Sequence, residues 1–258
     1  MGFTINGFCN QSEHTAPRKS LVRVRFPGKN TALSYYNDAF DLKVGDRVFV
    51  EGTLEGQLGR VVEVSYSFKI KLSDYRKVIA LADTDVHGQF YMALSHFVTF
   101  DRSTLPAAQA AGWFKPPVKE DEEIIVSCDD SSFPLEKLEK MDILPTIAER
   151  GHEYYLDNRV RYLSLDGEQG FAIVEGSEHY AVQFRYRDGL ISQLVCDCPC
   201  VCTCKHEFAA MLQLRETLEQ IEKHYAEDFK RSGYFAAVFK GTLFCFAIDG
   251  KETGSFTL

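Results

Sequence analysis

The chain has 258 residues, a formal net charge of −8, 45% hydrophobic residues and 26% charged residues. These values are typical of a globular protein with one to three domains. No stretch approaches 18 uncharged apolar residues, so the sequence predicts neither a transmembrane helix nor a membrane partner. The N-terminus also lacks the charged start and long apolar run of a signal peptide.

The charge is unevenly distributed along the chain. Residues 1–77 hold twelve Lys and Arg against eight Asp and Glu, a net charge of +4. Residues 78–258 hold seventeen Lys and Arg against twenty-nine Asp and Glu, a net charge of −12. Because phosphate binding needs local positive charge, contact with nucleic acid is expected from the first part rather than the second.

Short alternating segments separated by turn residues dominate the first hundred residues. In residues 20–26, Val22, Val24 and Phe26 share one face of a strand, and a Pro-Gly turn leads to a partner strand at 31–36. Such spacing predicts a small all-β barrel over residues 18–102, and the run Val-Gly-Asp-Arg-Val-Phe-Val resembles SH3-like or KOW-type barrels. Further strands are predicted at 42–50, 59–66, 77–82 and 90–94.

Basic residues line the first predicted hairpin, with Tyr35 and Tyr36 opposite them. Basic residues interleaved with aromatic rings can follow a nucleic-acid backbone and stack on its bases. The simpler interpretation, which we favour, is the solvated outer face of a half-buried sheet. The candidate nucleic-acid contacts are Arg18, Lys19, Arg23, Arg25 and Lys29.

Residues 103–123 interrupt this pattern and are predicted to be a linker. Pro106, Pro116 and Pro117 lie there beside an alanine-rich run and an acidic cluster. Trp113 and Phe114 are expected to dock within the chain. The linker would separate the barrel from a second domain over residues 124–258, which gives an α+β fold class overall.

The second domain is predicted to mix helices and strands. A helix is expected at 145–155, and a longer one follows residue 204, where apolar residues recur at three- and four-residue steps up to Phe229. Asp166-Gly167 and Asp188-Gly189 mark tight turns between strands. Strands are predicted at 160–165, 170–175 and 180–187, and terminal strands at 235–239, 242–248 and 254–257.

Five of the eight cysteines and one of the seven histidines fall within residues 196–206. In an extended segment, residues i and i+2 point to the same face, so Cys196 and Cys198 can present two sulfurs to one ion. Cys204 and His206 form a second pair where the long helix should begin. Three cysteines and one histidine suit tetrahedral zinc. Free thiols at this density predict a reducing compartment, so a cytoplasmic location is expected.

The order C-x-C, short gap, C-x-H and helix resembles the SWIM zinc-finger family. The resemblance covers roughly residues 148–222 and includes the two strands that lead into the finger. It implies that the zinc ligands are Cys196, Cys198, Cys204 and His206. Cys200 and Cys202 are additional thiols in the gap, and either can replace a neighbour as a ligand.

The sequence shows no Walker loop, dinucleotide-binding glycine pattern, nucleophile elbow or paired-carboxylate motif. Four protein ligands would also close the coordination sphere of the metal, so the zinc is expected to be structural. The prediction is a non-enzymatic zinc-binding protein. The resemblance implies a partner that is nucleic acid, DNA rather than RNA, or protein. The alternatives are a protein–protein adaptor without nucleic-acid contact, and an enzyme whose site is not visible in the sequence.

Overall fold

The computed structural model describes residues 17–67, 74–116, 132–200, 202–249 and 256–258. The chain has a mixed α+β fold, as predicted, and it divides into two compact units, Met1–Leu81 and Ala82–Leu258. Within the described residues, no helix has both the length and the apolar character needed to cross a membrane.

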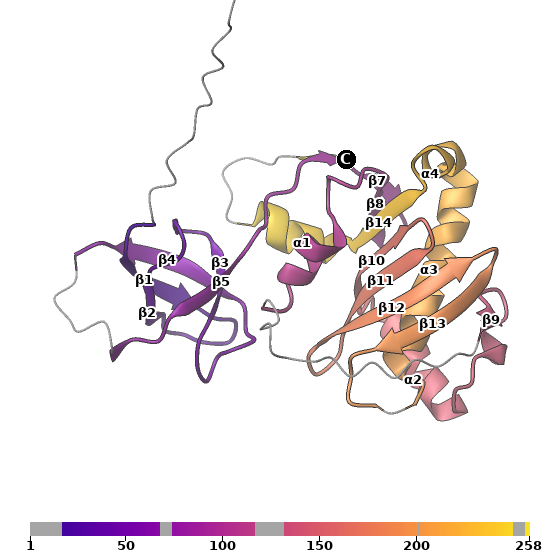
Figure 1. Ribbon diagram of the computed structural model, residues 1–258, viewed down its shortest axis with the longest axis horizontal. Coiled ribbons are helices and arrows are strands. Elements are labelled where there is room, and N and C mark those ends of the chain that lie inside the picture. The colour runs from indigo at the N-terminus through magenta and orange to yellow at the C-terminus, as the bar shows by residue number, and fades with distance from the viewer. Residues whose placement is uncertain (1–16, 68–73, 117–131, 201, 250–255) are drawn as a thin grey trace, which may run out of the picture. The chain divides into compact units, whose positions relative to one another are not determined.

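The first unit contains a five-stranded sheet in the order β2-β1-β4-β3-β5 within its described residues, and the pairs β2-β1, β1-β4 and β4-β3 are antiparallel (Figure 1). Its two edges meet, because Tyr36 of β2 bridges Lys77 and its N–H donates to the carbonyl of Arg76, just before β5. The sheet is therefore curled on itself around an apolar interior that includes Val22, Val24 and Val61. The strands are β1 (Ser20–Arg25), β2 (Leu33–Asn37), β3 (Arg47–Val50), β4 (Gly59–Ser65) and β5 (Val78–Ala82).

The second unit is built on an eight-stranded sheet in the order β7-β8-β14-β10-β11-β12-β13-β9 within the described residues. A parallel pair, β15 with β6, lies apart from this sheet. The strands are β6 (Gly88–Gln89), β7 (Tyr91–Ala93), β8 (His96–Thr99), β9 (Phe133–Pro134), β10 (Val160–Asp166), β11 (Gln169–Glu175), β12 (His179–Arg187), β13 (Leu190–Cys196), β14 (Tyr234–Phe239) and β15 (Phe256–Thr257).

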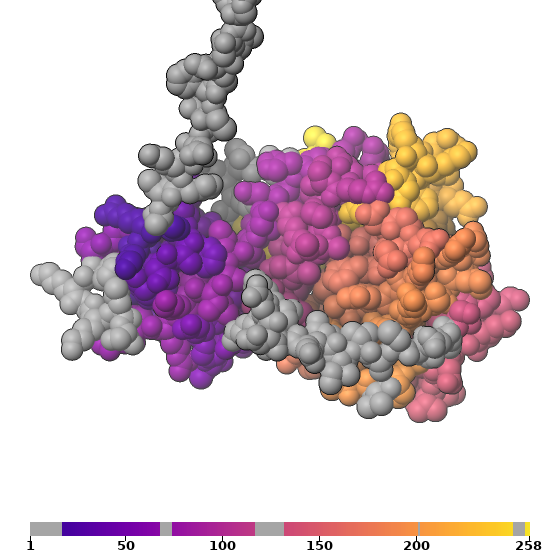
Figure 2. Space-filling model, viewed as in Figure 1, coloured from indigo at the N-terminus to yellow at the C-terminus, as the bar shows by residue number. Residues whose placement is uncertain are grey.

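Helices cover both faces of this sheet. One apolar cluster joins Ala172 and Val174 of β11 to Met211 of the long helix α3, and a second joins Ile173 of β11 to Trp113 behind α1. Since both faces are buried, the central strands are nearly continuous apolar runs. The side chains fill the spaces between the ribbons on the face seen in Figure 2. The helices are α1 (Ala107–Gly112), η2 (Leu138–Lys140), α2 (Pro145–Leu156), α3 (Lys205–His224), α4 (Ala226–Ser232), α5 (Lys240–Leu243) and the π-helical turn η3 (Phe244–Ile248).

The division between the units lies earlier than the predicted boundary at residue 102. The strand predicted at 90–94 was expected to help close the barrel over 18–102, but β7 in that segment pairs with β8, and β8 pairs with β14 in the sheet of the second unit. The pairing Ala237↔Val98 joins segments far apart in the sequence, which a local pattern does not reveal. The second unit thus begins at Ala82 rather than at residue 124.

The predicted linker over 103–123 is folded in the part that the structure describes. Helix α1 occupies residues 107–112, and Trp113 behind it is 1% exposed. The Trp113 ring stacks on Phe246 with centroids 4.9 Å apart, and its N–H donates to the carbonyl of Asp83 at 2.6 Å. Pro106 and Pro116 therefore flank a helix that is packed against the rest of the unit. The expected docking of Trp113 within the chain is observed. Residues 117–123 lie outside the described residues.

The terminal segment differs from its prediction in one element. Strand β14 falls at the predicted 235–239, but residues 242–248 are helical in α5 and η3 instead of extended. Leu243 and Ala247 are both fully buried and four residues apart, so the helical turn places them on one face against the second cluster. Of the third predicted strand, residues 256–257 form β15, and 254–255 lie outside the described residues.

Candidate metal centre

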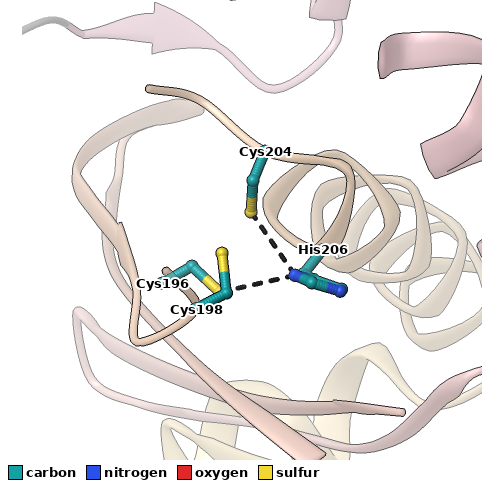
Figure 3. A group of neighbouring side chains, drawn as sticks. All are labelled: Cys196, Cys198, Cys204 and His206. Carbon is teal, nitrogen blue, oxygen red and sulfur yellow. Dashed lines mark hydrogen bonds between the residues drawn. The ribbon is translucent and has the colours of Figure 1, made fainter. Parts of the chain in front are cut away.

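Two elements that are adjacent in the chain bring four soft side chains together. Cys196 ends strand β13, Cys198 follows two residues later, Cys204 precedes helix α3, and His206 lies in its first turn. Their ligand atoms all lie within 4.8 Å of one another. Figure 3 shows the four side chains converging from the strand end and the helix start. The cluster can hold a metal ion.

The histidine is oriented with Nδ1 toward the sulfurs. His206 Nδ1 lies 3.8 Å from the sulfur of Cys196 and 3.7 Å from the sulfur of Cys204. The other ring nitrogen, Nε2, is buried and has no hydrogen-bond partner among the described residues. The ring can therefore donate a lone pair at Nδ1 while Nε2 keeps the proton.

The donors are withdrawn from solvent, and this disfavours their charged forms. Burial raises the pKa of Cys198 to about 12. The hydrogen bond with Cys196 and burial together raise the pKa of Cys204 above its ordinary value. Burial lowers the pKa of His206 to about 4. Without a cation, the site thus keeps these two thiols protonated and the imidazole neutral, and a bound divalent ion would reverse this for the thiols.

The start of helix α3 is fixed by a reciprocal pair of hydrogen bonds. The backbone N–H of Cys204 donates to Glu207 Oε2 at 2.6 Å, and the Cys204 sulfur accepts the backbone N–H of Glu207. This is a capping box in which cysteine replaces the usual serine or threonine. It fixes the backbone between Cys204 and His206, so the second ligand pair is held in place by the helix start itself.

The first ligand pair is held by Asp197, which lies between its two cysteines. The Asp197 N–H donates to the Ala181 carbonyl at 3.1 Å, and its Oδ1 accepts the Ala181 N–H at 2.8 Å. Its Oδ2 forms an ion pair with Lys115, from the segment behind α1. Three contacts thus anchor the turn that carries Cys196 and Cys198.

Two residues that precede the cysteine segment enclose the histidine ring, one in β12 and one in the turn between β11 and β12. Tyr180 of β12 stacks on His206, and Gly176 lies close to its Nε2, where an added Cβ would be 3.0 Å from that nitrogen. Neither residue stands out in the sequence as part of the site. The Glu207 cap could have been found from its spacing three residues after Cys204, whereas Asp197, Tyr180 and Gly176 gave no such signal.

The other two thiols of the segment face solvent. Cys200 and Cys202 are exposed and are not part of the converging group. The backbone N–H of Cys200 donates to the sulfur of Cys198. The sequence left open whether Cys200 or Cys202 replaces a neighbouring cysteine as a ligand. The described geometry brings together the four residues without them.

The five candidate nucleic-acid contacts are all exposed and belong to the first unit. Arg23 pairs with Glu63 at 3.4 Å, and the guanidinium of Arg18 lies 4.2 Å from the centre of the Tyr66 ring. Tyr35 and Tyr36, which the nucleic-acid interpretation would use for base stacking, are each only 5% exposed. Both rings are packed within the unit, so they are not available to a base.

Comparison with protein-family models, with curated proteins and with solved structures found no match to this chain.

Proposed function

We propose that this chain is a non-enzymatic zinc-binding protein in which a Cys₃His centre has a structural role. The observation that carries the proposal is the separation of the donors. A tetrahedral zinc ion, with Zn–S of about 2.3 Å and Zn–N of about 2.0 Å, separates a sulfur from a nitrogen by about 3.5 Å. The Nδ1 of His206 lies 3.7 Å and 3.8 Å from two of the sulfurs.

The type and number of donors favour zinc in a closed site. Thiolate and imidazole ligands suit zinc better than the hard cations, which prefer oxygen. Four protein ligands complete the tetrahedron, and Cys198, Cys204 and His206 are buried. A bound ion would supply charge neutralisation for three thiolates and a crosslink between β13 and α3. The chain's own residues orient the ligands, and no coordination position is left for an activated water molecule.

The arrangement of the flanking elements supports an interaction module. A hairpin of β12 and β13 leads into the C-x-C pair, and a helix follows the C-x-H pair. This order resembles SWIM fingers, which as a family act in nucleic-acid and protein contact. We therefore propose that residues 148–222 mediate contact with nucleic acid, DNA rather than RNA, or with protein. The curled sheet of the first unit fits an SH3-like or KOW-type barrel that presents Arg18, Lys19, Arg23, Arg25 and Lys29.

A protein–protein adaptor without nucleic-acid contact is the second candidate. The net charge of −12 over residues 78–258 favours it, since a phosphate backbone would be repelled by this part of the chain. The buried positions of Tyr35 and Tyr36 favour it as well, because single-strand binding draws on exposed aromatic rings.

Metal content and its structural effect test the zinc centre. Protein purified under reducing conditions should carry a single zinc ion in native mass spectrometry, and Cys198→Ser or His206→Ala should lose it. Cys245→Ser, at an exposed cysteine elsewhere in the chain, is the control and should retain the ion. Chelation should lower the helical circular dichroism of α3 and leave the β-sheet signal of the first unit. A wild-type chain that carries no metal would refute the proposal.

The salt dependence of DNA binding separates the two candidate partners. If the first unit contacts phosphates, the logarithm of the DNA association constant K should fall linearly with the logarithm of the salt concentration. The slope should become less steep by about 1 for each phosphate contact that a substitution removes. Arg25→Ala should reduce the slope, while Lys43→Ala, also exposed but outside the first hairpin, should not. A salt slope near zero in the wild type would exclude phosphate contact and favour the protein–protein adaptor.

A further inference from the structure

The converging ligands and the two remaining thiols of the segment differ sharply in accessibility. Cys198, Cys204 and His206 are 8%, 3% and 4% exposed, whereas Cys200 and Cys202 are both exposed and free. Cys196 is half-buried, so three of the four donors to a metal held by the converging group are withdrawn from an external ligand. The exposed thiols lie on the same short loop, two residues from a converging cysteine on either side.

This arrangement matters for how a metal enters and leaves. A four-coordinate ion with no open position exchanges when an incoming ligand displaces a resident one. A chelator or metal donor in solution cannot easily reach the buried sulfurs, but a thiol already on the loop can. Consecutive Cα atoms are about 3.8 Å apart, so two residues span at most about 7 Å, which is within the reach of a cysteine side chain after a local turn.

We infer that Cys200 and Cys202 form an exchange relay that passes zinc between solvent ligands and the buried Cys₃His centre. The inference rests on the proposed zinc centre and adds an activity to it, namely metal transfer with soft external ligands such as small thiols. Cys200 relays for Cys198, and Cys202 relays for Cys204. In the resting centre neither thiol is a ligand.

The exchange step is a ligand substitution without oxidation or reduction. A bond forms between zinc and the sulfur of Cys200 while the bond between zinc and the sulfur of Cys198 breaks. The proton leaves the Cys200 thiol to solvent, and the released Cys198 thiolate takes one up from solvent. The hydrogen bond from the Cys200 N–H to the Cys198 sulfur keeps the two residues side by side for this step. The external ligand then displaces Cys200 in the same way.

If the relay exists, removing Cys200 and Cys202 should change the rate of zinc transfer without changing the affinity for zinc. Transfer of zinc from the full chain to the chromogenic chelator 4-(2-pyridylazo)resorcinol should be followed in time for the wild type, Cys200→Ser/Cys202→Ser and the control Cys245→Ser. The double variant should keep a single zinc ion and its affinity, while transfer slows by about tenfold, because serine is a far poorer soft-metal ligand than a thiolate. The control should transfer at the wild-type rate.

Each other outcome overturns the relay in a distinguishable way. Equal transfer rates in the double variant and the control, with a single zinc ion in both, would leave the exposed thiols without a role in exchange. Loss of zinc from the double variant at equilibrium would make them ligands of the resting centre. A wild-type chain without metal would remove the zinc centre itself, and this is measured before any rate.

Discussion

Tyr180 lies stacked on His206, with ring centroids 4.4 Å apart and ring planes inclined by 25°. Tyr180 belongs to β12, and its hydroxyl is hydrogen-bonded to Ser177 at 2.8 Å, so the ring is held along its length and at its tip. The stack fixes the plane of the imidazole and leaves Nδ1 facing Cys196 and Cys204. A strand that precedes the cysteine segment thus orients the ligand that ends it.

Replacing Tyr180 should therefore weaken metal binding without touching a ligand. Tyr180→Leu keeps an apolar side chain but removes the flat surface, so His206 gains rotational freedom and zinc affinity should fall by about tenfold. Tyr180→Phe is the control, since it loses only the contact with Ser177 and should bind nearly as the wild type does. Competition with a chelator of known affinity measures both. Wild-type affinity in Tyr180→Leu would show that the stack has no role in orienting the ligand.

The second prediction concerns the space beside the same ring. In Gly176→Ala the added Cβ would lie 3.0 Å from His206 Nε2 and 2.9 Å from the Tyr180 ring, so the imidazole or the tyrosine must move. Overpacking of this kind costs about 1–3 kcal/mol, and zinc affinity should fall with it. Gly112→Ala meets nothing within 4 Å and serves as the matched control. Thermal unfolding and metal competition of both variants should show a loss for Gly176→Ala alone.

The third prediction separates two contacts of Asp197. Asp197→Asn keeps an oxygen that can accept the Ala181 N–H but loses the charge opposite Lys115, whereas Asp197→Ala loses both. Because the backbone contact holds the turn of Cys196 and Cys198, affinity for zinc should fall by about tenfold in Asp197→Ala and much less in Asp197→Asn. Lys115→Met should resemble Asp197→Asn. Equal losses in Asn and Ala variants would make the ion pair the important contact instead.

The fourth prediction concerns Trp113. Its ring is almost fully buried against Phe246, so Trp113→Ala should destabilise the second unit by about 3–5 kcal/mol. Trp113→Phe keeps much of the ring stack and loses the hydrogen bond to Asp83, so it should cost clearly less. Urea unfolding followed by circular dichroism measures the difference. A loss below about 1 kcal/mol for Trp113→Ala is what an undocked linker would give.

The fifth prediction is a pH dependence that arises from His96. This residue is fully buried, Nε2 donates to the Val160 carbonyl at 2.8 Å, and burial lowers its pKa to about 4. The unfolded chain binds the same proton near pH 6.5, so the stabilisation is complete above pH 6.5 and declines as the pH falls toward 4. At pH 5 the loss should be about 2 kcal/mol relative to pH 7.

The variant His96→Gln isolates this contribution. Glutamine keeps an N–H donor toward Val160 but does not titrate, so the stability difference between wild type and variant should shrink by about 2 kcal/mol from pH 7 to pH 5. Other titrating groups are present in both proteins and cancel in the difference. Urea unfolding at the two pH values gives the comparison. A difference that stays constant with pH would mean that His96 is protonated at the same pH in the folded and unfolded chains.

Local patterns predicted those parts of the fold that neighbours in the chain determine. The strands β10, β11 and β12 and the helix α3 follow directly from apolar periodicity and turn residues. The convergence of Cys196, Cys198, Cys204 and His206 was predicted as well, because their spacing already places them in pairs. The domain boundary was not, since β8 finds its partner β14 more than 130 residues later, and this pairing leaves no mark in the local pattern.

The surroundings of the candidate metal centre depend on such distant pairings too. Tyr180 and Gly176 reach His206 because β12, which carries Tyr180, lies beside β13 in the sheet, and Gly176 lies in the turn that leads from β11 into β12. Lys115 reaches Asp197 from a segment expected to be a linker. Residues 242–248 illustrate the opposite error. Their aromatic and β-branched residues favour a strand, yet burial of Leu243 and Ala247 on one face selects a helical turn.

The position of β14 bears on how the protein is made. This strand lies between β8 and β10, although it follows all the other strands of the eight-stranded sheet in the chain. During synthesis, the edges of β8 and β10 that pair with β14 therefore stay unpaired until residue 239 has left the ribosome. The cysteine segment and α3 emerge earlier. The nascent second unit is exposed to edge-to-edge association throughout that interval. Premature termination before Tyr234 would leave the sheet split into two halves, so such fragments should be retained by chaperones or degraded.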